Sequence, residues 1–298
     1  MAEKKKKNKT KGPRFFNDAK ATYVPPTLDF KTSTTVWNVD EQIRKRYKHW
    51  RMLLDDDGVG GSRANSHRKE GSAYSGTYSV FPAPLAEWIY LRYAGEAPAR
   101  VFDPFSGGPP RGAVAAMMGH EYHGVDIRRE AVDECREVLE TLGLEAMYHV
   151  GDARNYNPDV GKFDFSIACP PYYNLEVYSD QEDDLSNLGT YKEFLNEMKP
   201  VAKNTFKLLK EGAFCALVVG NFRQTSKKKN ATTMDSYITD FRGDMVRVYK
   251  KAGFRLFQDI VLKRSAGSAA VRAGRHWSGG MKLVAMHEYL LIFRKPTK

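Results

Sequence analysis

The sequence predicts a doubly wound α/β domain with a mostly parallel sheet, located at residues 74–298 behind an N-terminal extension. From Ala99 onward, apolar segments of strand length alternate with segments of helical length, which requires a sheet covered by helices on both faces. The last two apolar segments follow one another without a helix between them and favour an antiparallel pair at that point. Successive strands end in polar or conformationally restricted residues, and in such sheets ligands bind at the carboxyl ends of the strands.

The expected strands span residues 99–105, 122–127, 145–152, 163–169, 213–222, 255–263 and 287–295. The expected helices span residues 110–118, 130–142, 191–209 and 235–252. Pro109 and Pro110 suit the start of the first helix, because the amides of a first helical turn have no partner within the helix. Pro170 and Pro171 end the fourth strand, since proline supplies no amide for pairing and fixes its own φ.

The extension divides into a tail and a longer connecting part. Residues 1–20 are charged with few apolar side chains, and we expect them to be disordered. Residues 21–73 form the rest of the extension. Residues 40–54 have a helical pattern that places five apolar side chains on one face: Ile43, Tyr47, Trp50, Leu53 and Leu54. Residues 55–72 are polar and glycine-rich, and a loop of that length is usually mobile or functional.

Charge and composition narrow the class of partner. Lys and Arg number 47 against 36 Asp and Glu, so the net charge is +11, which suits a polyanionic partner. The basic residues gather in separate clusters: the N-terminal tail and residues 44–51, 223–230 and 263–282. The chain has no apolar run long enough for a membrane helix and no secretory start, so we expect a cytoplasmic protein of a bacterial or phage-infected cell. The 3 cysteines are widely spaced and predict neither a disulfide framework nor a metal site.

The first strand runs into the loop "DPFSGG", residues 103–108. Gly107 and Gly108 allow a sharp turn and a close approach of the backbone to a ligand. The loop continues as "GGPPRG", with prolines where a dinucleotide fingerprint would turn amides toward a pyrophosphate. Pyrophosphate binding is therefore disfavoured, and the acidic Asp103 suits a cationic ligand such as a methionine ammonium or a sulfonium.

Two further carboxylates follow the next two strands. Asp126 lies about twenty residues after the glycines, the position from which a carboxylate binds both hydroxyls of a ribose. Asp152 ends the third strand, where it can accept a hydrogen bond from an adenine amino group. Together with the glycine pair, these residues predict an adenosine-containing cofactor, and the loop chemistry favours S-adenosylmethionine.

Several segments resemble the ordered motifs of the amino-group DNA methyltransferases. They are "FDPFSGG", "GVDI", "GDARN", "CPPYYN" and the closing "HEYLLIFRKP", preceded by "YSVFPAPLAEWIYLRY" at residues 78–93. The resemblance covers residues 74–296, and "CPPY…LEVYSD" is most similar to phage-type modification methylases. It implies the Rossmann-like fold of methyltransferases that use S-adenosylmethionine (SAM). It also implies methylation of cytosine N4 or adenine N6 in double-stranded DNA.

The resemblance also implies roles for individual residues. Asp103, Phe105 and Gly107 would bind the methionine part of the cofactor, and Asp126 the ribose. Phe81 and Pro82 would help to close the cofactor pocket, and Pro170, Pro171 and Tyr172 would hold the target base. Physical reasoning agrees, because a base must leave the duplex to reach a methyl donor and then needs an aromatic face and hydrogen-bond acceptors. Tyr172 offers the face, and the carbonyl before the rigid proline pair offers an acceptor.

Cys169 departs from the pattern, because the resembled family usually has Asp, Asn or Ser at this position. One mechanism treats the thiol as a near-isostere of serine, with the backbone carbonyl orienting the amino group. The other treats it as a thiolate that adds to a pyrimidine and activates carbon 5, with Glu176 acting on the ring nitrogen. The sequence leaves both mechanisms open, and we expect methylation of the amino group.

DNA recognition is expected outside the cofactor-binding part. Residues 263–282 lie between two strands, are too long for a hairpin turn, and form a candidate target-recognition insertion. Its candidate contacts are Arg272, Arg275 and His276, and a second candidate group that would neutralise phosphates is Arg223, Lys227, Lys228 and Lys229. Two other classes stay open at this point: a non-catalytic nucleic-acid-binding protein that kept the fold, and an RNA methyltransferase.

Overall fold

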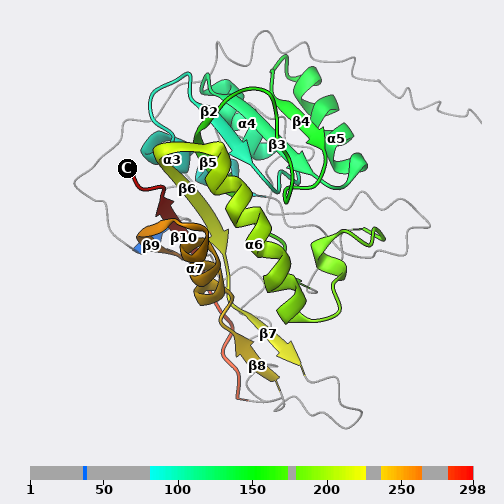
Figure 1. Cartoon of the computed structure of the whole chain (residues 1–298), viewed down its shortest axis with the longest axis vertical. Coiled ribbons are helices and arrows are strands. Elements are labelled where there is room, and N and C mark those ends of the chain that lie inside the picture. Colours follow the sequence, from blue (N-terminus) through cyan, green and yellow to red (C-terminus); the bar gives the residue numbers. More distant parts are fainter. Residues whose placement is uncertain (1–35, 39–80, 174–178, 226–235, 264–280, 298) are drawn as a thin grey trace, which may run out of the picture.

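The computed structural model describes residues 36–38, 81–173, 179–225, 236–263 and 281–297 (Figure 1). Our expectations for the tail at 1–20, the helix at 40–54 and the loop at 55–72 lie outside these residues. The main sheet contains β1 (Val36–Asn38), β2 (Arg100–Asp103), β3 (Glu121–Asp126), β4 (Met147–Val150), β5 (Phe163–Ala168), β6 (Leu209–Val219), β9 (Arg255–Lys263) and β10 (His287–Arg294). Its helices are α3 (Ala83–Tyr93), α4 (Pro110–Met117), α5 (Arg129–Thr141), α6 (Tyr191–Leu208) and α7 (Phe241–Ala252), with a short 3-10 helix η3 (Leu185–Asn187).

The main sheet has 8 strands in the order β1-β9-β10-β6-β5-β2-β3-β4 among the described residues. Neighbouring strands pair in parallel except around β10, which is antiparallel to both β6 and β9. This order confirms the doubly wound, mostly parallel architecture and the antiparallel pair expected at the end of the chain. No helix within the described residues is long and apolar enough to span a membrane.

Helices cover both faces of the sheet, and its strands are therefore buried on both sides. One apolar cluster joins α3, α4 and α5 to the sheet, with Ile89, Val114 and Leu139 among its fully or almost fully buried members. The other cluster joins α6 and α7 to the opposite face, where Met198 and Met245 are fully buried. Figure 1 shows α6 and α7 lying together on this second face. Each fully buried Leu, Ile, Val or Met side chain contributes about 1.5–3 kcal/mol to folding.

The segment between β6 and α7 differs from our expectation. Residues 235–240 were expected to begin a helix, but Ser236–Thr239 form β8, which pairs antiparallel with β7 (Phe222–Thr225) in a separate two-stranded sheet. The β-branched and aromatic residues of "SYIT" favour a strand. Helix α7 begins only after Asp240, whose side chain accepts a hydrogen bond from the Gly243 amide at 3.0 Å. The β7–β8 hairpin extends away from the main sheet at the lower end of Figure 1.

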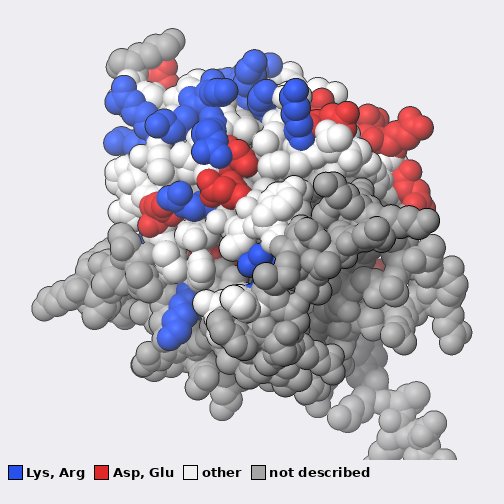
Figure 2. Space-filling view, turned by 90° about the horizontal axis from the view of Figure 1, so that it is seen from below, with Lys and Arg blue, Asp and Glu red and all other residues white. Residues whose placement is uncertain are grey.

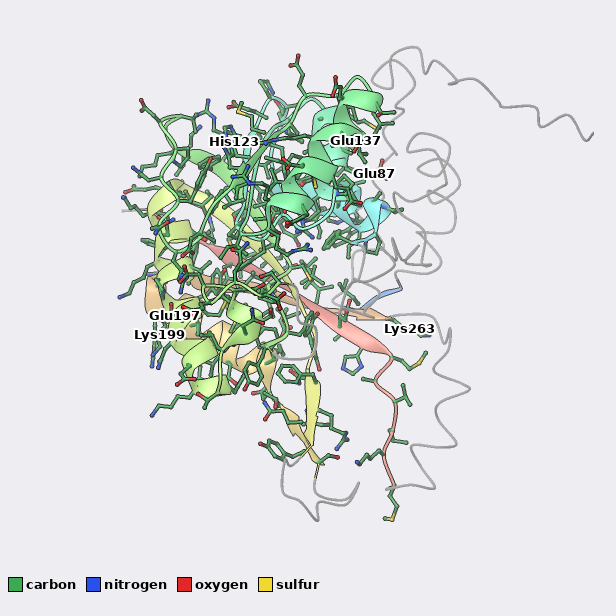
Figure 3. The ribbon with its side chains drawn as sticks, turned by 90° about the vertical axis from the view of Figure 1, so that its right-hand side faces the viewer. Glu87, His123, Glu137, Glu197, Lys199 and Lys263 are labelled. Atoms are coloured by element: carbon green, nitrogen blue, oxygen red, sulfur yellow. The ribbon has the colours of Figure 1, made fainter. Side chains whose placement is uncertain are left out.

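The extension contributes one strand to the sheet. Residues 36–38 form β1 and pair in parallel with residues 261–263 at the end of β9. Our division at residue 74 therefore separates β1 from the domain whose sheet it completes. Figure 3 shows Lys263, the last residue of β9, next to this strand.

The direction of winding reverses between β2 and β5. After β2 the chain passes to β3 and β4 on one side, and it then returns to β5 on the other side of β2. A crevice forms at the carboxyl ends of the strands where a doubly wound sheet reverses, and ligands of this fold class bind there. The loop after β2 and the turn after β5 therefore border the expected binding site.

Candidate cofactor and substrate site

The glycine loop after β2 presents a bare backbone surface. Gly107 has a left-handed conformation with φ 51°, which glycine adopts without strain. A Cβ atom placed on Gly107 would meet nothing nearer than the Phe105 carbonyl oxygen at 3.9 Å, and one on Gly108 would lie 3.6 Å from Pro110. As far as the described residues go, the space in front of this surface is therefore open, and it can receive a ligand in contact with the main chain.

Asp126 ends β3 beside this loop. One carboxylate oxygen accepts a hydrogen bond from the Gly107 amide at 2.9 Å, and the other accepts one from the Arg128 amide at 2.9 Å. Burial raises the pKa of Asp126, although Arg128 and the two amides act in the opposite direction. Each oxygen retains a second lone pair, so the carboxylate can still accept hydrogen bonds from two ribose hydroxyls.

Asp152 lies after β4, next to the end of β3. Gly151, its neighbour in the chain, donates a backbone hydrogen bond of 2.9 Å to the Asp126 carbonyl. The two Asp152 carboxylate oxygens accept hydrogen bonds from the amide and Nε of Arg154, at 2.8 and 2.7 Å. Arg154 also binds Glu197 on α6 at 2.5 Å, so α6 helps to fix the end of β4. Asp126 and Asp152 are thus brought together, as expected for two residues that bind one nucleoside.

Asp103, at the end of β2, is buried inside the protein and does not reach the open surface of the glycine loop. Its side chain is fully buried, and it accepts hydrogen bonds from Nε of Arg111 at 2.5 Å and from the Tyr122 hydroxyl at 2.7 Å. This arrangement does not agree with our expectation that Asp103 offers its charge to a cationic ligand, because the guanidinium of Arg111 already balances that charge. The signal that could have shown this is Arg111 itself, eight residues further along the chain at the start of a helix.

Phe81 and Pro82 precede helix α3, on the same side of the sheet as α4. Pro82 is the N-cap of α3, and Phe81 is 92% buried with the Arg111 guanidinium 4.8 Å from its ring centroid. Phe81 therefore packs against the arginine whose guanidinium binds the glycine loop, and Pro82 begins α3 next to it in the chain.

The turn "CPPY" follows β5 at the other side of the reversal point. Cys169 is half-buried, packs against the cluster of α3 and α4, and lies near enough to Arg111 to interact with its charge. Cys135 and Cys215 differ, because both are buried and desolvation raises the pKa of each thiol, to about 12 for Cys215. Cys169 is therefore the cysteine placed for contact with a ligand.

Tyr172 packs where β6 ends and α7 begins. Its ring centroid lies 5.5 Å from that of Phe241, and its Cε1 lies 3.5 Å from the point that a Cβ of Gly220 would occupy. The side chain of Glu288, near the start of β10, reaches within 3.4 Å of the same point. The sequence did not single out Gly220 or Glu288, although a glycine directly after the apolar strand "ALVV" indicates a close approach.

Tyr173 has a conformation that non-glycine residues rarely adopt. Its φ is 53°, and such strain costs about 1–3 kcal/mol and is most common at functional sites. Its hydroxyl donates a hydrogen bond of 3.0 Å to the Gly189 carbonyl, and its ring contacts Tyr191 and Phe194 on α6. Packing against α6 thus stabilises the turn that presents the proline pair and Tyr172.

The two expected DNA-binding segments begin at the carboxyl edge of the sheet. Arg223 lies on β7, and the insertion begins where β9 ends, at the same edge. Figure 2 shows the molecule from below: described Lys and Arg side chains gather mainly along its upper left margin, and Asp and Glu side chains lie in the middle of this face and along its right margin. The other predicted residues lie outside the described part of the chain: Glu176, Lys227, Lys228, Lys229, Arg272, Arg275 and His276.

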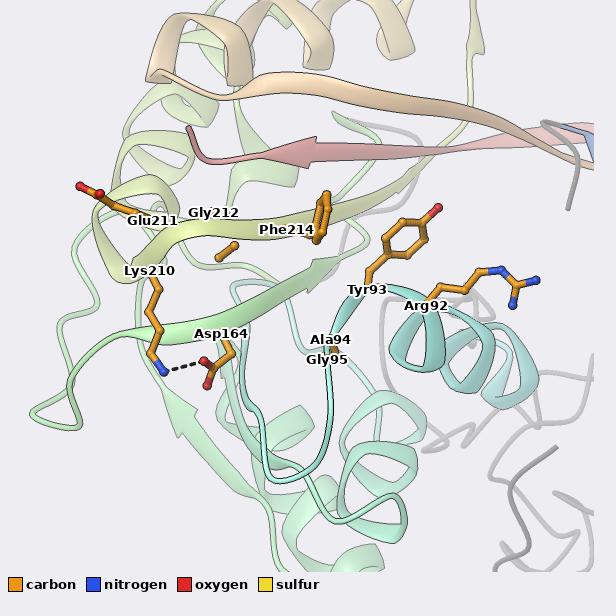
Figure 4. Close-up of a pocket in the computed structure, with 10 residues that line it drawn as sticks. Arg92, Tyr93, Ala94, Gly95, Asp164, Lys210, Glu211, Gly212 and Phe214 are labelled. Carbon is orange, nitrogen blue, oxygen red and sulfur yellow. Dashed lines mark hydrogen bonds and ion pairs between the residues drawn. The ribbon is translucent and has the colours of Figure 1, made fainter. Parts of the chain in front are cut away.

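A shallow pocket of about 290 Å³ lies at the opposite edge of the sheet, among the described residues at the amino ends of β5 and β6 (Figure 4). Its walls include Tyr93, Phe214 and the ion pair between Lys210 and Asp164 at 2.5 Å. It contains none of the residues that the sequence predicted for cofactor or base. Since ligands of this fold class bind at the carboxyl ends of the strands, we place the site there.

Comparison with known proteins agrees with the geometry. A family model described as DNA methylase matches residues 163–298, which include the turn after β5 and the last strands. The match supports a SAM-dependent methyltransferase. It also supports S-adenosylmethionine as the cofactor. No curated protein sequence matches the chain.

Solved structures with a similar arrangement of elements include several methyltransferases. A SAM-dependent methyltransferase from Methanosarcina mazei is 16% identical, with a TM-score of 0.48 over 74% of this chain and 100% of that chain. TrmN from Thermus thermophilus is 17% identical, with a TM-score of 0.47 over 72% of this chain. The match spans about half of TrmN, 49% of its chain. The fold of this chain is established by its own strand order.

Proposed function

We propose that the protein is a SAM-dependent DNA methyltransferase that methylates the exocyclic amino group of a base held outside the duplex, at cytosine N4 or adenine N6. One observation carries the proposal: the glycine loop and the "CPPY" turn follow the carboxyl ends of two neighbouring parallel strands, β2 and β5, on either side of the reversal point of the sheet. A cofactor held by the first and a base held by the second would meet in one crevice. The match to a DNA methylase family supports DNA as the substrate.

The cofactor side of the site fits S-adenosylmethionine. The open surface at Gly107 and Gly108 would admit the methionine part, the Asp126 carboxylate would bind the ribose, and the Asp152 carboxylate would bind the adenine amino group. S-adenosylmethionine supplies an electrophilic methyl group on its sulfonium. The chain has to hold this cofactor, orient the base and exclude water. These tasks require rigid side chains around the site and no additional charged group in it.

The base side of the site offers acceptors and an aromatic surface. The carbonyl groups before the two prolines are fixed in direction, because each proline restricts the backbone around it. Tyr172 lies between Gly220 and Phe241, and stacking of a base on an aromatic ring contributes about 1–3 kcal/mol. We assign Tyr172 to the wall against which the base packs, and the carbonyl of Cys169 or Pro170 to the amino proton.

The β7–β8 hairpin extends from the same edge of the sheet and would contact the duplex. Two side chains of β8, Tyr237 and Ile238, are 60% exposed, and Arg223 lies opposite Ile238 on β7. A two-stranded ribbon fits the major groove of DNA, and arginine binds phosphates and guanine edges. The insertion at 263–282, which starts at the end of β9, would also contact DNA. The similarity to phage-type enzymes and a cytoplasmic location stay predictions of the sequence.

A second function, carbon-5 methylation of a pyrimidine, is favoured by one observation. Cys169 is partly exposed beside the Arg111 guanidinium, and a nearby cation favours a thiolate. Asp103 forms an ion pair with that guanidinium and cancels most of its charge, which argues against an activated thiolate. We therefore rank methylation of the amino group first.

Nucleoside mass spectrometry tests the proposal directly. DNA from cells that express the protein is digested, and the three methylated nucleosides are quantified separately. We expect N4-methylcytosine or N6-methyladenine, and no methylated nucleoside above background from cells that express the Asp126→Ala variant. Because 5-methylcytosine would identify the second function, the same measurement decides between them. Unmodified DNA from an expressed protein that binds S-adenosylmethionine would contradict both functions.

A further inference from the structure

Hydrogen bonds from within the protein hold the backbone of the glycine loop between Phe105 and Gly107. Three amides donate inward: Phe105 to Asp103 at 3.0 Å, Ser106 to the Val125 carbonyl at 2.9 Å, and Gly107 to Asp126 at 2.9 Å. Four carbonyls accept from side chains: Phe105 at 2.5 Å and Ser106 at 3.1 Å from Arg111, Gly107 at 3.1 Å from the Cys135 thiol, and Pro109 at 3.2 Å from Tyr148. These contacts fix the loop between Phe105 and Gly107 in the absence of a ligand.

Arg111 is central to these contacts. It is 96% buried, forms an ion pair with Asp103 at 2.5 Å, and uses Nη2 for the two loop carbonyls. Asp103 raises the pKa of Arg111 further above its usual range, so the guanidinium stays charged despite its burial. Only the planar guanidinium reaches a carboxylate and two carbonyls at once in fixed directions, which a lysine ammonium does not reproduce.

Tyr122 completes the Asp103 side of the arrangement. Its hydroxyl donates to the carboxylate oxygen that also accepts from Arg111, at 2.7 Å. The ring is 99% buried, and desolvation raises the pKa of the hydroxyl, so it stays a donor. Removal of one partner from a buried polar group of this kind leaves an unsatisfied charge or acceptor, which is costly in a low-dielectric interior.

We propose that Arg111, held by Asp103 and Tyr122, is a positioning residue that preforms the glycine loop for S-adenosylmethionine. The inference rests on the proposed function and deepens it. Arg111 does not face the open surface at Gly107 and Gly108, and it acts on the ligand only through the shape of the loop. A loop ordered before binding loses less conformational freedom when the ligand arrives, so affinity rises without any added contact.

The first experiment is calorimetric titration of the full chain with S-adenosylmethionine, well below the unfolding temperature. Arg111→Lys keeps the positive charge but loses the planar guanidinium and its fixed set of donors. We expect its dissociation constant to rise at least tenfold at full stoichiometry, and its KM for DNA to stay within twofold of wild type. A purely structural defect would instead lower the number of binding sites and leave the dissociation constant unchanged.

Two tyrosine variants provide a matched pair. Tyr122→Phe removes the hydroxyl that binds Asp103, and Tyr249→Phe removes an equally buried hydroxyl on α7, on the other face of the sheet. We expect Tyr122→Phe to weaken cofactor binding several-fold and Tyr249→Phe to leave it unchanged. In the cofactor-free protein, the amides of Ser106 and Gly107 should exchange hydrogen faster in Arg111→Lys and Tyr122→Phe than in Tyr249→Phe.

The outcomes separate this inference from the proposed function. If the wild-type protein does not bind S-adenosylmethionine, the proposed function fails, and the hydrogen-exchange comparison still tests the loop. If wild type binds and both loop variants bind equally well, Arg111 is not a positioning residue. Equal weakening by Tyr249→Phe would attribute the effect to general destabilisation and overturn the inference. Should Arg111→Lys not fold, Tyr122→Phe alone decides between these results.

Discussion

The Gly107 amide donates a hydrogen bond of 2.9 Å to the Asp126 carboxylate. This contact joins the loop after β2 to the end of β3, nineteen residues further along the chain. The surface proposed for the methionine part and the carboxylate proposed for the ribose are therefore fixed relative to one another. A substitution at Asp126 removes a ligand contact and a support of the loop together, and the choice of replacement can separate the two effects.

Asp126→Asn keeps an acceptor for the Gly107 amide and loses the charge. Since hydrogen bonds to charged groups contribute about 1.5–3 kcal/mol, we expect S-adenosylmethionine to bind roughly ten- to a hundredfold more weakly. Asp126→Ala should weaken binding further because the loop also loses its support. Isothermal calorimetry measures both affinities. Asp133→Asn, an exposed carboxylate on α5, serves as the control, and wild-type affinity in Asp126→Asn would remove Asp126 from the site.

Cofactor binding should weaken in mild acid. Burial raises the pKa of Asp126, with Arg128 opposing and Asp103 adding to the shift, and only the ionised carboxylate accepts from both ribose hydroxyls. Affinity should therefore fall as the pH drops through this raised pKa, above the usual range of an aspartate. Protein stability should change in the opposite direction. The Asp126 carboxyl binds its proton more tightly in the folded than in the unfolded state, so its contribution to the free energy of unfolding increases as the pH falls. Calorimetry between pH 4 and pH 8 checks the first statement, and Asp126→Asn should show a flatter pH dependence.

Cys169→Ser distinguishes the two candidate reactions. If the thiol only shapes the base pocket, serine is similar in size and a better acceptor, and substantial methyl transfer should remain. If the thiolate attacks the pyrimidine ring, activity should vanish, because serine is weakly nucleophilic without an adjacent base. We expect an active variant in an assay of methyl transfer to DNA. Loss of activity in a folded, cofactor-binding variant, with trapping of 5-fluorocytosine DNA by wild type alone, would establish carbon-5 chemistry.

DNA binding should depend steeply on salt and in part on the hairpin. Each neutralised phosphate adds about 0.9 to the slope of log affinity against log salt. We expect Arg223→Gln to reduce the slope by about one and to weaken binding, measured by fluorescence anisotropy from low to physiological salt. Arg247→Gln removes an arginine exposed on α7 and should leave the slope unchanged. Identical slopes for wild type and Arg223→Gln would exclude a phosphate contact at this position.

The sequence predicts the main sheet well because its pattern is local. The alternation of apolar strands with helices predicts a doubly wound sheet. The polar residues that end β2, β3 and β5 indicate where its strand order reverses. The β7–β8 hairpin was missed because the polar residues around it give no alternation, and the helical pattern of α7 was extended across them. Asp240, a preferred N-cap residue, marks the true start of that helix.

Contacts within the site were harder to predict. Asp103 and Arg111 are charged, and charged side chains are expected at the surface or at a ligand, so their mutual burial was not foreseen. Glu288 and Gly220 lie far apart in the sequence and meet only through the antiparallel pairing of β10 with β6. Tyr173 depends on packing against α6, which follows eighteen residues later, and no local pattern indicates its left-handed backbone.

The short strand β1 determines where the chain can be cut. It pairs with the end of β9, so removal of the first 73 residues would leave the backbone amides and carbonyls of β9 without their partners along residues 261–263. An unpaired sheet edge invites pairing with another chain, and with it aggregation. A shortened protein intended for crystallisation or assay should therefore retain residues 36–38, because the N-terminal part of the chain supplies the edge strand of the sheet on this side.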